Sequence, residues 1–81
     1  MSEQEVFEKI QDIFKDIFDD ENLEISYSTN SSHIEDWDSL NHINLIVAIE
    51  TELNVKFDLE EVATLKDIGA MINMLLAKLN S

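Results

Sequence analysis

A reactive hydroxyl group stands near the middle of the chain, where an acidic stretch meets an apolar one. Ser39 directly follows Asp38 and precedes Leu40 and a run of apolar residues with helical spacing. At the first turn of a helix, unpaired backbone N–H groups and the positive end of the helix dipole favour an attached or bound anion. We therefore expect Ser39 to carry a phosphodiester. Taken alone, the same serine is also typical of an ordinary helix start.

Two histidines near this serine raise the question of catalysis or metal binding. His42 lies one helical turn after Ser39, but a hydrolytic serine–histidine pair needs a base within hydrogen-bond reach, an orienting third group and an oxyanion loop. His33 lies close to Glu35 and Asp36, yet its distance from His42 in the chain is not a recognised metal-ligand spacing. We expect no catalytic residue and no metal site.

The first element that the sequence predicts is an amphipathic helix from residue 3 to about residue 18. Ser2 and Glu5, three residues apart, form a capping box at its start. Apolar residues then recur with helical spacing and predict a buried face: Val6, Phe7, Ile10, Ile13, Phe14, Ile17 and Phe18. The acidic residues 19–21 that follow form either a cation site or a solvated helix end. The absence of a calcium-loop pattern favours the solvated end.

A long connection from about residue 21 to residue 38 separates this helix from the next. Its middle is rich in serine, threonine and asparagine and is prone to turns. Apolar residues are nevertheless spaced through it: Leu23, Ile25, Tyr27, Ile34 and Trp37. Loops of this length in small domains are usually either functional or disordered. The apolar residues predict an ordered loop that lies on the rest of the fold.

The second predicted helix runs from Asp38 or Ser39 to about Leu53, with Asn54 as its C-cap. One side of this helix collects residues that predict a core face: Leu45, Ile46, Ile49 and Leu53. Another side collects a second apolar strip: Leu40, Ile43 and Val47. This strip is either a docking surface or the second buried face of a central helix, and the sequence leaves both open.

Two further helices complete the predicted fold. Asp58 and Glu61 form a capping box for a short helix over Leu59–Ala63, and Thr64, with Asp67 three residues later, is expected to cap the last helix. The last helix has one apolar face: Ile68, Met71, Ile72, Leu75, Leu76 and Leu79. Nothing alternates like a strand. The predicted fold class is therefore all-α, a bundle of three long helices and one short helix in a single domain, residues 1–81.

Charge is the strongest signal in the composition. The chain has 81 residues, of which 18 are acidic and five basic, for a net charge of −13, and it has no cysteine. Such a surface repels nucleic acid and anionic membranes and attracts partners with basic patches. No apolar run has the length of a membrane span, and the first residues lack the basic start of a signal peptide. We expect a cytoplasmic monomer that divalent cations stabilise.

The order of these elements around Asp38-Ser39-Leu40 resembles the acyl carrier protein family over nearly the whole chain. The resemblance implies that Ser39 bears a 4′-phosphopantetheine arm, derived from coenzyme A, whose thiol holds an acyl group as a thioester. It implies that a phosphopantetheinyl transferase installs the arm, with Asp38 helping to position a metal ion and the serine. The chain would then be a carrier, not an enzyme, that serves acyltransferases, synthases or ligases of a fatty-acid, polyketide or other specialised pathway.

The resemblance also implies a surface for partner enzymes and a pocket for the acyl group. The apolar anchor of that surface would be Leu40, Ile43 and Val47. Its electrostatic guides would be Asp38, Glu50 and Glu52. The acyl chain would lie between the helices, against Ile46, Ile49, Leu53, Phe57 and Ile68. These five residues are equally expected for an ordinary core, and the sequence leaves both open.

Some residues depart from the pattern of housekeeping fatty-acid carriers. Trp37 stands before Asp38 where those carriers usually have a small residue, and it either pins the long loop or contacts partner enzymes. Asn41, His42 and Asn44 make the second helix less acidic than usual. These departures suggest a specialised carrier. The alternatives are an aminoacyl or peptidyl carrier and an unmodified acidic helical module that binds a basic protein.

Overall fold

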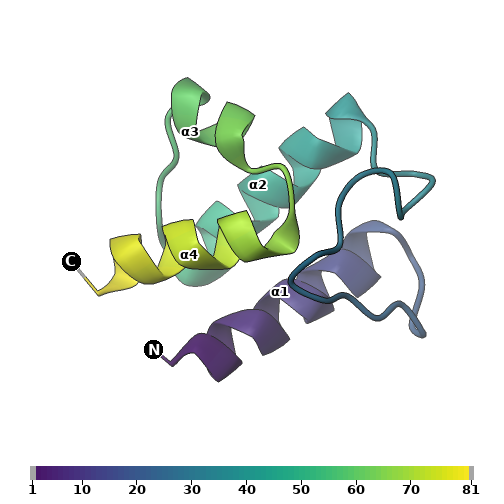
Figure 1. Ribbon diagram of the computed structural model, residues 1–81, viewed down its shortest axis with the longest axis horizontal. Helices are drawn as coiled ribbons and strands as arrows, with labels where there is room; N and C mark the ends of the chain where they lie inside the picture. Colours follow the sequence, from purple (N-terminus) through teal and green to yellow (C-terminus); the bar gives the residue numbers. More distant parts are fainter. Residues whose placement is uncertain (1, 81) are drawn as a thin grey trace.

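The computed structural model describes residues 2–80, which form four helices joined by one long and two short connections (Figure 1). The helices are α1 (Glu3–Ile17), α2 (Ser39–Leu53), α3 (Leu59–Thr64) and α4 (Ile68–Leu79). α1 packs against both α2 and α4, while the short α3 lies on the outside of the bundle. Within residues 2–80 there is no strand, only an isolated antiparallel bridge between Asn30 and Asp67. The predicted all-α fold is confirmed.

None of the helices described between residues 2 and 80 has the length and apolarity that crossing a lipid bilayer requires.

Hydrogen bonds from side chains define where the helices begin. The Ser2 hydroxyl accepts from the backbone N–H of Glu5, and the Glu5 carboxylate accepts from the backbone N–H of Ser2, which holds the pKa of Glu5 below its usual range. Asp58 and Glu61 form the same reciprocal pair at α3. Both predicted capping boxes are therefore confirmed. Asn54 ends α2 in the left-handed conformation, as expected of a C-cap.

The predicted cap of the last helix was wrong. Asp67, not Thr64, is the N-cap of α4, because its carboxylate accepts from the backbone N–H of Ala70 at 2.8 Å. The Thr64 hydroxyl instead donates to the carbonyl of Glu61 at the end of α3, over 2.8 Å. A hydroxyl that bonds back to a preceding carbonyl is not available to cap the next helix.

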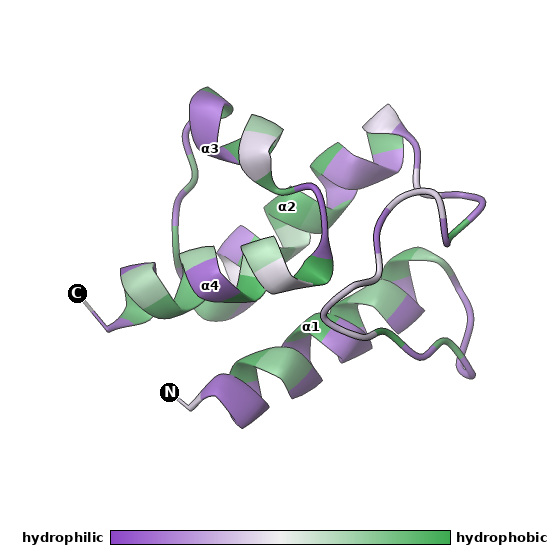
Figure 2. Cartoon of the chain, viewed as in Figure 1, coloured by the Kyte–Doolittle hydropathy of each residue, from purple (hydrophilic) through white to green (hydrophobic). Residues whose placement is uncertain are grey.

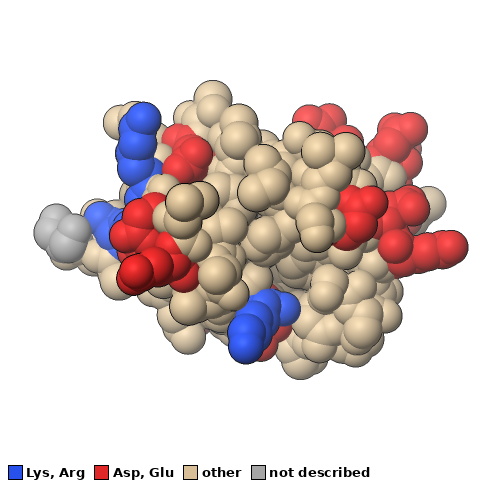
Figure 3. All heavy atoms as spheres, turned by 90° about the horizontal axis from the view of Figure 1, so that it is seen from above, with Lys and Arg blue, Asp and Glu red and all other residues tan. Residues whose placement is uncertain are grey.

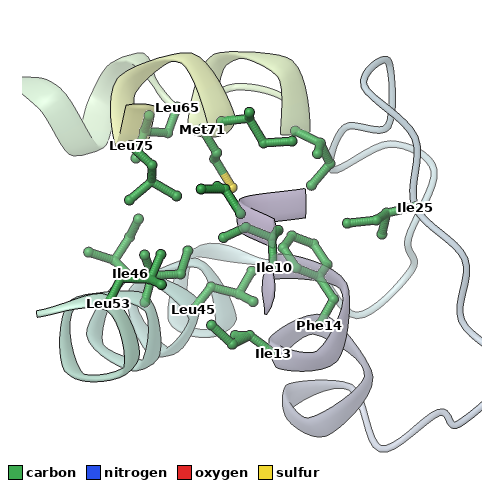
Figure 4. Packing of buried hydrophobic residues seen from close by; sticks show 14 of the residues in the cluster. Ile10, Ile13, Phe14, Ile25, Leu45, Ile46, Leu53, Leu65, Met71 and Leu75 are labelled. Atoms are coloured by element: carbon green, nitrogen blue, oxygen red, sulfur yellow. The ribbon is translucent and has the colours of Figure 1, made fainter. Parts of the chain in front are cut away.

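The core lies between α1, α2 and α4, and α3 buries no residue in it. In Figure 4 the labelled side chains of these three helices point into one shared interior, and Ile25 enters it from the long loop. α2 contributes the four residues predicted for its core face: Leu45, Ile46, Ile49 and Leu53. In Figure 2 hydrophobic residues dominate α4, whereas α1 alternates between hydrophobic and hydrophilic residues along its length. This pattern is that of an amphipathic helix with one buried face.

The long loop between α1 and α2 is ordered and lies on the bundle, as predicted. Ile25 and Trp37 are buried in the core, and the backbone N–H of Ile25 donates to the side chain of Gln11 in α1. The loop also contacts the start of α4, where the carbonyls of Thr29 and Tyr27 accept from the first two backbone N–H groups of that helix at 3.0 and 2.9 Å. These bonds satisfy amides that a helix leaves unpaired.

Candidate functional site

Ser39 is the first residue of α2, and its side chain is exposed. Asp38 precedes it as the N-cap, with its carboxylate accepting from the backbone N–H of Asn41 at 2.9 Å. The backbone N–H groups of Ser39 and Leu40 have no acceptor within residues 2–80. The hydroxyl therefore stands in solvent beside two unpaired amides at the positive end of a 15-residue helix, which is the location that the sequence predicted.

Trp37 fixes the backbone that leads into this site. Its side chain is only 6% exposed and packs edge-on against Phe14 of α1, with ring centroids 5.1 Å apart. Such an aromatic pair adds to the free energy gained from burial. Of the two roles considered for Trp37, the structure agrees with the one in which it pins the loop.

His42 uses both of its ring nitrogens to hold neighbouring segments. Nδ1 accepts a hydrogen bond from the indole N–H of Trp37 at 3.1 Å, so this nitrogen carries no proton. Nε2 lies 3.3 Å from the carbonyl of Val62 in α3, to which it donates in that tautomer. Neither nitrogen is free to take a proton from Ser39. This geometry agrees with the expectation that Ser39 and His42 form no hydrolytic pair.

An open hollow of about 700 Å³ adjoins Ser39. It lies between the long loop, the start of α2 and the link from α3 to α4, and it is lined by Asn30, Ser31, Trp37, Asp38, Ser39, His42, Ile43, Leu65, Lys66 and Asp67. None of the five residues predicted for an acyl pocket lines it. Four of those five are buried in the core, and Phe57 is half-buried beside α3. The acyl pocket therefore stays a prediction.

The second apolar strip of α2 faces solvent. Leu40 is 70% exposed, Ile43 51% and Val47 54%, whereas the buried residues of the same helix are Leu45, Ile46, Ile49 and Leu53. The strip is thus not a second core face, and it begins one residue after Ser39. Exposed apolar side chains gathered beside a functional group are typical of an interaction surface.

The three acidic residues predicted to guide a partner also make contacts within the chain. Asp38 caps α2, and Glu50, which is half-buried, accepts from the backbone N–H of Phe57 at 2.8 Å. Glu52 lies 3.6 Å from the ammonium group of Lys9 on α1. Figure 3 shows acidic side chains gathered toward both ends of one face of the molecule, with a largely uncharged middle. Partner guidance by these three residues stays a prediction.

Within the described part of the chain, no group of three or more histidine, aspartate or glutamate side chains has the arrangement of a metal site. His33, considered above with Glu35 and Asp36, accepts a hydrogen bond from the backbone N–H of Asn30 through Nδ1 at 3.0 Å. This contact stabilises a turn in the long loop.

Comparisons with known proteins point to one family. The family model described as "Phosphopantetheine attachment site" matches residues 8–75. The chain is 31% identical to an acyl carrier protein of Petrotoga mobilis, over 99% of this chain and 94% of the relative. It is 30% identical to an acyl carrier protein of Lactobacillus acidophilus, over 90% of this chain and 91% of that relative. It also resembles the solution NMR structure of a holo acyl carrier protein from Geobacter metallireducens, with a TM-score of 0.86, 35% identity, and coverage of 93% of this chain and 86% of that one.

Proposed function

The chain belongs to the acyl carrier protein family, and on that basis we propose that Ser39 is the residue to which its phosphopantetheine group is attached. The prosthetic group of this family supplies a thiol at the end of a flexible arm, on which an acyl group rides as a thioester. Ser39 is supported as the attachment residue by one observation above all. Its exposed hydroxyl is on the first residue of α2, directly after a capping aspartate.

The residues around Ser39 fit a phosphodiester. Two unpaired backbone N–H groups and the positive helix end favour the negative charge. Asp38 uses one carboxylate oxygen for its capping bond to Asn41, which leaves its second carboxylate oxygen without a hydrogen bond within residues 2–80. We propose that this oxygen helps a transferase to orient the serine, while Leu40, which is exposed directly after Ser39 in the chain, provides an apolar contact for that enzyme.

We propose that the chain delivers acyl groups and does not transform them. Acyl carrier proteins are carriers, and the imidazole of His42, three residues after Ser39, is held by Trp37 and Val62. A general base must reach the proton that it removes, and His42 is committed to two other partners.

The exposed strip of α2 is the surface that we propose for partner enzymes. Carrier domains interact with a phosphopantetheinyl transferase and with synthases. Leu40, Ile43 and Val47 together expose apolar area next to the attachment residue, as an interface core requires. The net charge of −13 would attract enzymes with basic patches, with Glu50 at the edge of the strip as a candidate contact.

For the cargo, we propose an acyl group of a specialised pathway. The first turn of α2 has no acidic residue, and Asn41, His42 and Asn44 stand where housekeeping carriers are more acidic. To be shielded from solvent, an acyl chain would have to push apart the core residues that were predicted to line the acyl pocket, because Ile49 and Ile68 among them are fully buried. An aminoacyl or peptidyl cargo on the same arm is the second candidate.

Modification by a transferase tests this proposal. The purified chain is incubated with coenzyme A, magnesium and a phosphopantetheinyl transferase of broad specificity, and its intact mass is measured. We expect the addition of one phosphopantetheinyl group to the natural chain and to the Ser32→Ala variant, a control at an exposed loop serine. We expect none for Ser39→Ala, with circular dichroism showing that it is folded. Addition to Ser39→Ala would contradict the proposal.

A further inference from the structure

The short helix α3 and the link before it are fastened to α2 at two levels. The carbonyl of Val62 in α3 lies 3.3 Å from Nε2 of His42, and the backbone N–H of Phe57 in the link donates to the Glu50 carboxylate at 2.8 Å. His42 and Glu50 stand about two helical turns apart on α2. The segment from residue 57 to residue 62 is therefore held along much of the length of α2.

Lys78 joins the same segment to α4. Its ammonium group lies 2.9 Å from the Glu61 carboxylate and 5.4 Å from the ring centroid of Phe57. The two charged side chains are only 24% and 27% exposed, so solvent screens their attraction less than that of a surface pair. The contact with the aromatic ring adds a cation–π interaction. Residues 57–62 thus form a strap that is bonded to α2 on one side and to α4 on the other (Figure 1).

This strap covers the residues that were predicted to line an acyl pocket. α1 packs against α2 and α4, and the apolar side chains of Phe57 and Val62 in the strap also pack against the core. Beneath them, Ile49 of α2 and Ile68 of α4 are fully buried. An alkyl chain that entered between α2 and α4 on this side would have to lift the strap. Lifting it breaks hydrogen bonds of half-buried groups, which is costly when no new partner replaces them.

We propose that this carrier keeps its acyl group outside the helix bundle, and that its cargo is a short acyl group with polar substituents. The proposal rests on the function proposed above, with Ser39 as the attachment residue. Every methylene of a long alkyl chain gains free energy by leaving water, whereas a short polar group gains little. A strap bonded to two helices therefore suits a cargo that needs no apolar shelter. Hydroxyacyl and aminoacyl groups belong to this class.

Loading the chain with acyl groups of two lengths tests this proposal. A transferase of broad specificity transfers the acylated arm from acetyl- or octanoyl-coenzyme A to the ¹³C-labelled chain, and the intact mass verifies the loading. We expect no nuclear Overhauser contacts from the unlabelled octanoyl chain to the methyl groups of Ile49 and Ile68, and the same core methyl spectrum for both loaded forms. Octanoyl contacts to either isoleucine would overturn the proposal. Loading that fails, or that persists in Ser39→Ala, would instead contradict the function proposed above.

Variants of the strap contacts test whether these contacts keep the core closed. Lys78→Met retains an unbranched apolar stem but removes the ammonium group from Glu61 and Phe57, and His42→Leu removes the contact with Val62. Lys66→Met is the matched control, since Lys66 is an exposed lysine in the link from α3 to α4.

We expect octanoyl contacts to Ile49 or Ile68 to appear when Lys78→Met and His42→Leu are combined, and to stay absent in Lys66→Met. Amide spectra verify the native fold of each variant, and Lys78→Met alone takes the place of the combination if the latter does not fold. An octanoyl chain that stays outside the core of the folded strap variant, as it does in Lys66→Met, would show that the strap contacts do not exclude it. That result would contradict the proposal.

Discussion

The indole N–H of Trp37 donates a 3.1 Å hydrogen bond to Nδ1 of His42, five residues further along the chain. The two rings are stacked, with centroids 6.1 Å apart. Through Nε2 the same imidazole reaches α3, so one side chain links the end of the long loop, α2 and α3. The segment that carries Ser39 is thus held by one hydrogen bond to Trp37 of the long loop and by another to Val62 of α3.

A double-mutant cycle measures this link. Trp37→Phe removes the donor and keeps an aromatic ring against Phe14, while His42→Leu removes the acceptor and leaves a buried N–H unpaired. We expect each change to lower the free energy of unfolding by about 1–3 kcal/mol. The double variant should lose about 1 kcal/mol less than the sum, as measured by urea unfolding. Effects that simply add would show that the hydrogen bond contributes nothing.

Gly69 should not tolerate alanine. A Cβ atom there would lie 3.1 Å from the carbonyl oxygen of Tyr27, and this carbonyl accepts a hydrogen bond from the N–H of Gly69 itself at 2.9 Å. The carbonyl cannot retreat without weakening that bond. We therefore expect Gly69→Ala to lower the free energy of unfolding by about 1 kcal/mol, although alanine is the better helix former.

Asn73→Ala is the matched control for Gly69→Ala, because Asn73 is exposed on the same helix. There the change should be neutral or should stabilise by up to about 0.7 kcal/mol. Both variants are compared by urea unfolding. If Gly69→Ala proved more stable than the natural chain, the close approach of the loop to α4 would be refuted.

Glu61 should contribute stability that depends on pH. The hydrogen bond from the ammonium group of Lys78 at 2.9 Å, followed by that from the backbone of Asp58, lowers the pKa of Glu61 below its ordinary value of 4.5. Because the pKa of Glu61 is lower in the folded state, the contribution of this carboxylate to the free energy of unfolding is complete above pH 4.5. It is lost as the pH falls through the folded-state pKa. Glu61→Gln should therefore unfold more easily than the natural chain at pH 7, with the difference disappearing in acid.

Glu60→Gln removes the same charge one residue earlier, where the side chain is exposed and has no hydrogen bond or ion pair within residues 2–80. In a chain of net charge −13, losing that carboxylate should not destabilise the fold at pH 7. Melting temperatures across the acid range distinguish the two variants. Identical curves for Glu60→Gln and Glu61→Gln would contradict a specific role of the Lys78 contact.

Ile43→Asp tests the partner surface. Because Ile43 is 51% exposed, we expect the change to alter the free energy of unfolding by no more than about 0.5 kcal/mol. Modification by a transferase, or acyl transfer by a cognate enzyme, should slow about tenfold, equivalent to about 1.4 kcal/mol of lost binding. Asn44→Asp adds the same charge at the next, exposed residue and should have little effect. Equal slowing by both variants would mean that the added negative charge, and not the loss of the apolar anchor, weakens the contact with the enzyme.

Features encoded within a few residues were predictable from the sequence. The capping boxes at Ser2 and Asp58 depend on residues three apart, and helical spacing placed Leu45 and Ile43 on different sides of α2, although it left open whether Ile43 is exposed. The cap of α4 was predicted wrongly because threonine and aspartate both suit an N-cap position. Only the hydrogen bond from the Thr64 hydroxyl to the Glu61 carbonyl shows that Thr64 is not the cap and leaves Asp67 as the cap.

Contacts between distant segments were not predictable. Lys78 reaches Glu61 across 17 residues, and His42 reaches Val62 across 20, at positions where no local pattern distinguishes these partners. The hollow beside Ser39 was missed for the same reason, since Asn30 and Lys66 meet there only through the packing of the loop on α4.

Tandem mass spectrometry on the chain purified from its own cells tests the central claim most directly. Trypsin, which cuts after lysine, yields one peptide of residues 16–56 that contains five serines: Ser26, Ser28, Ser31, Ser32 and Ser39. Fragmentation then assigns the modified residue. We predict one phosphopantetheinyl group on this peptide, located at Ser39. A group on any of the other four serines, or a peptide that is unmodified in every preparation, would contradict the account.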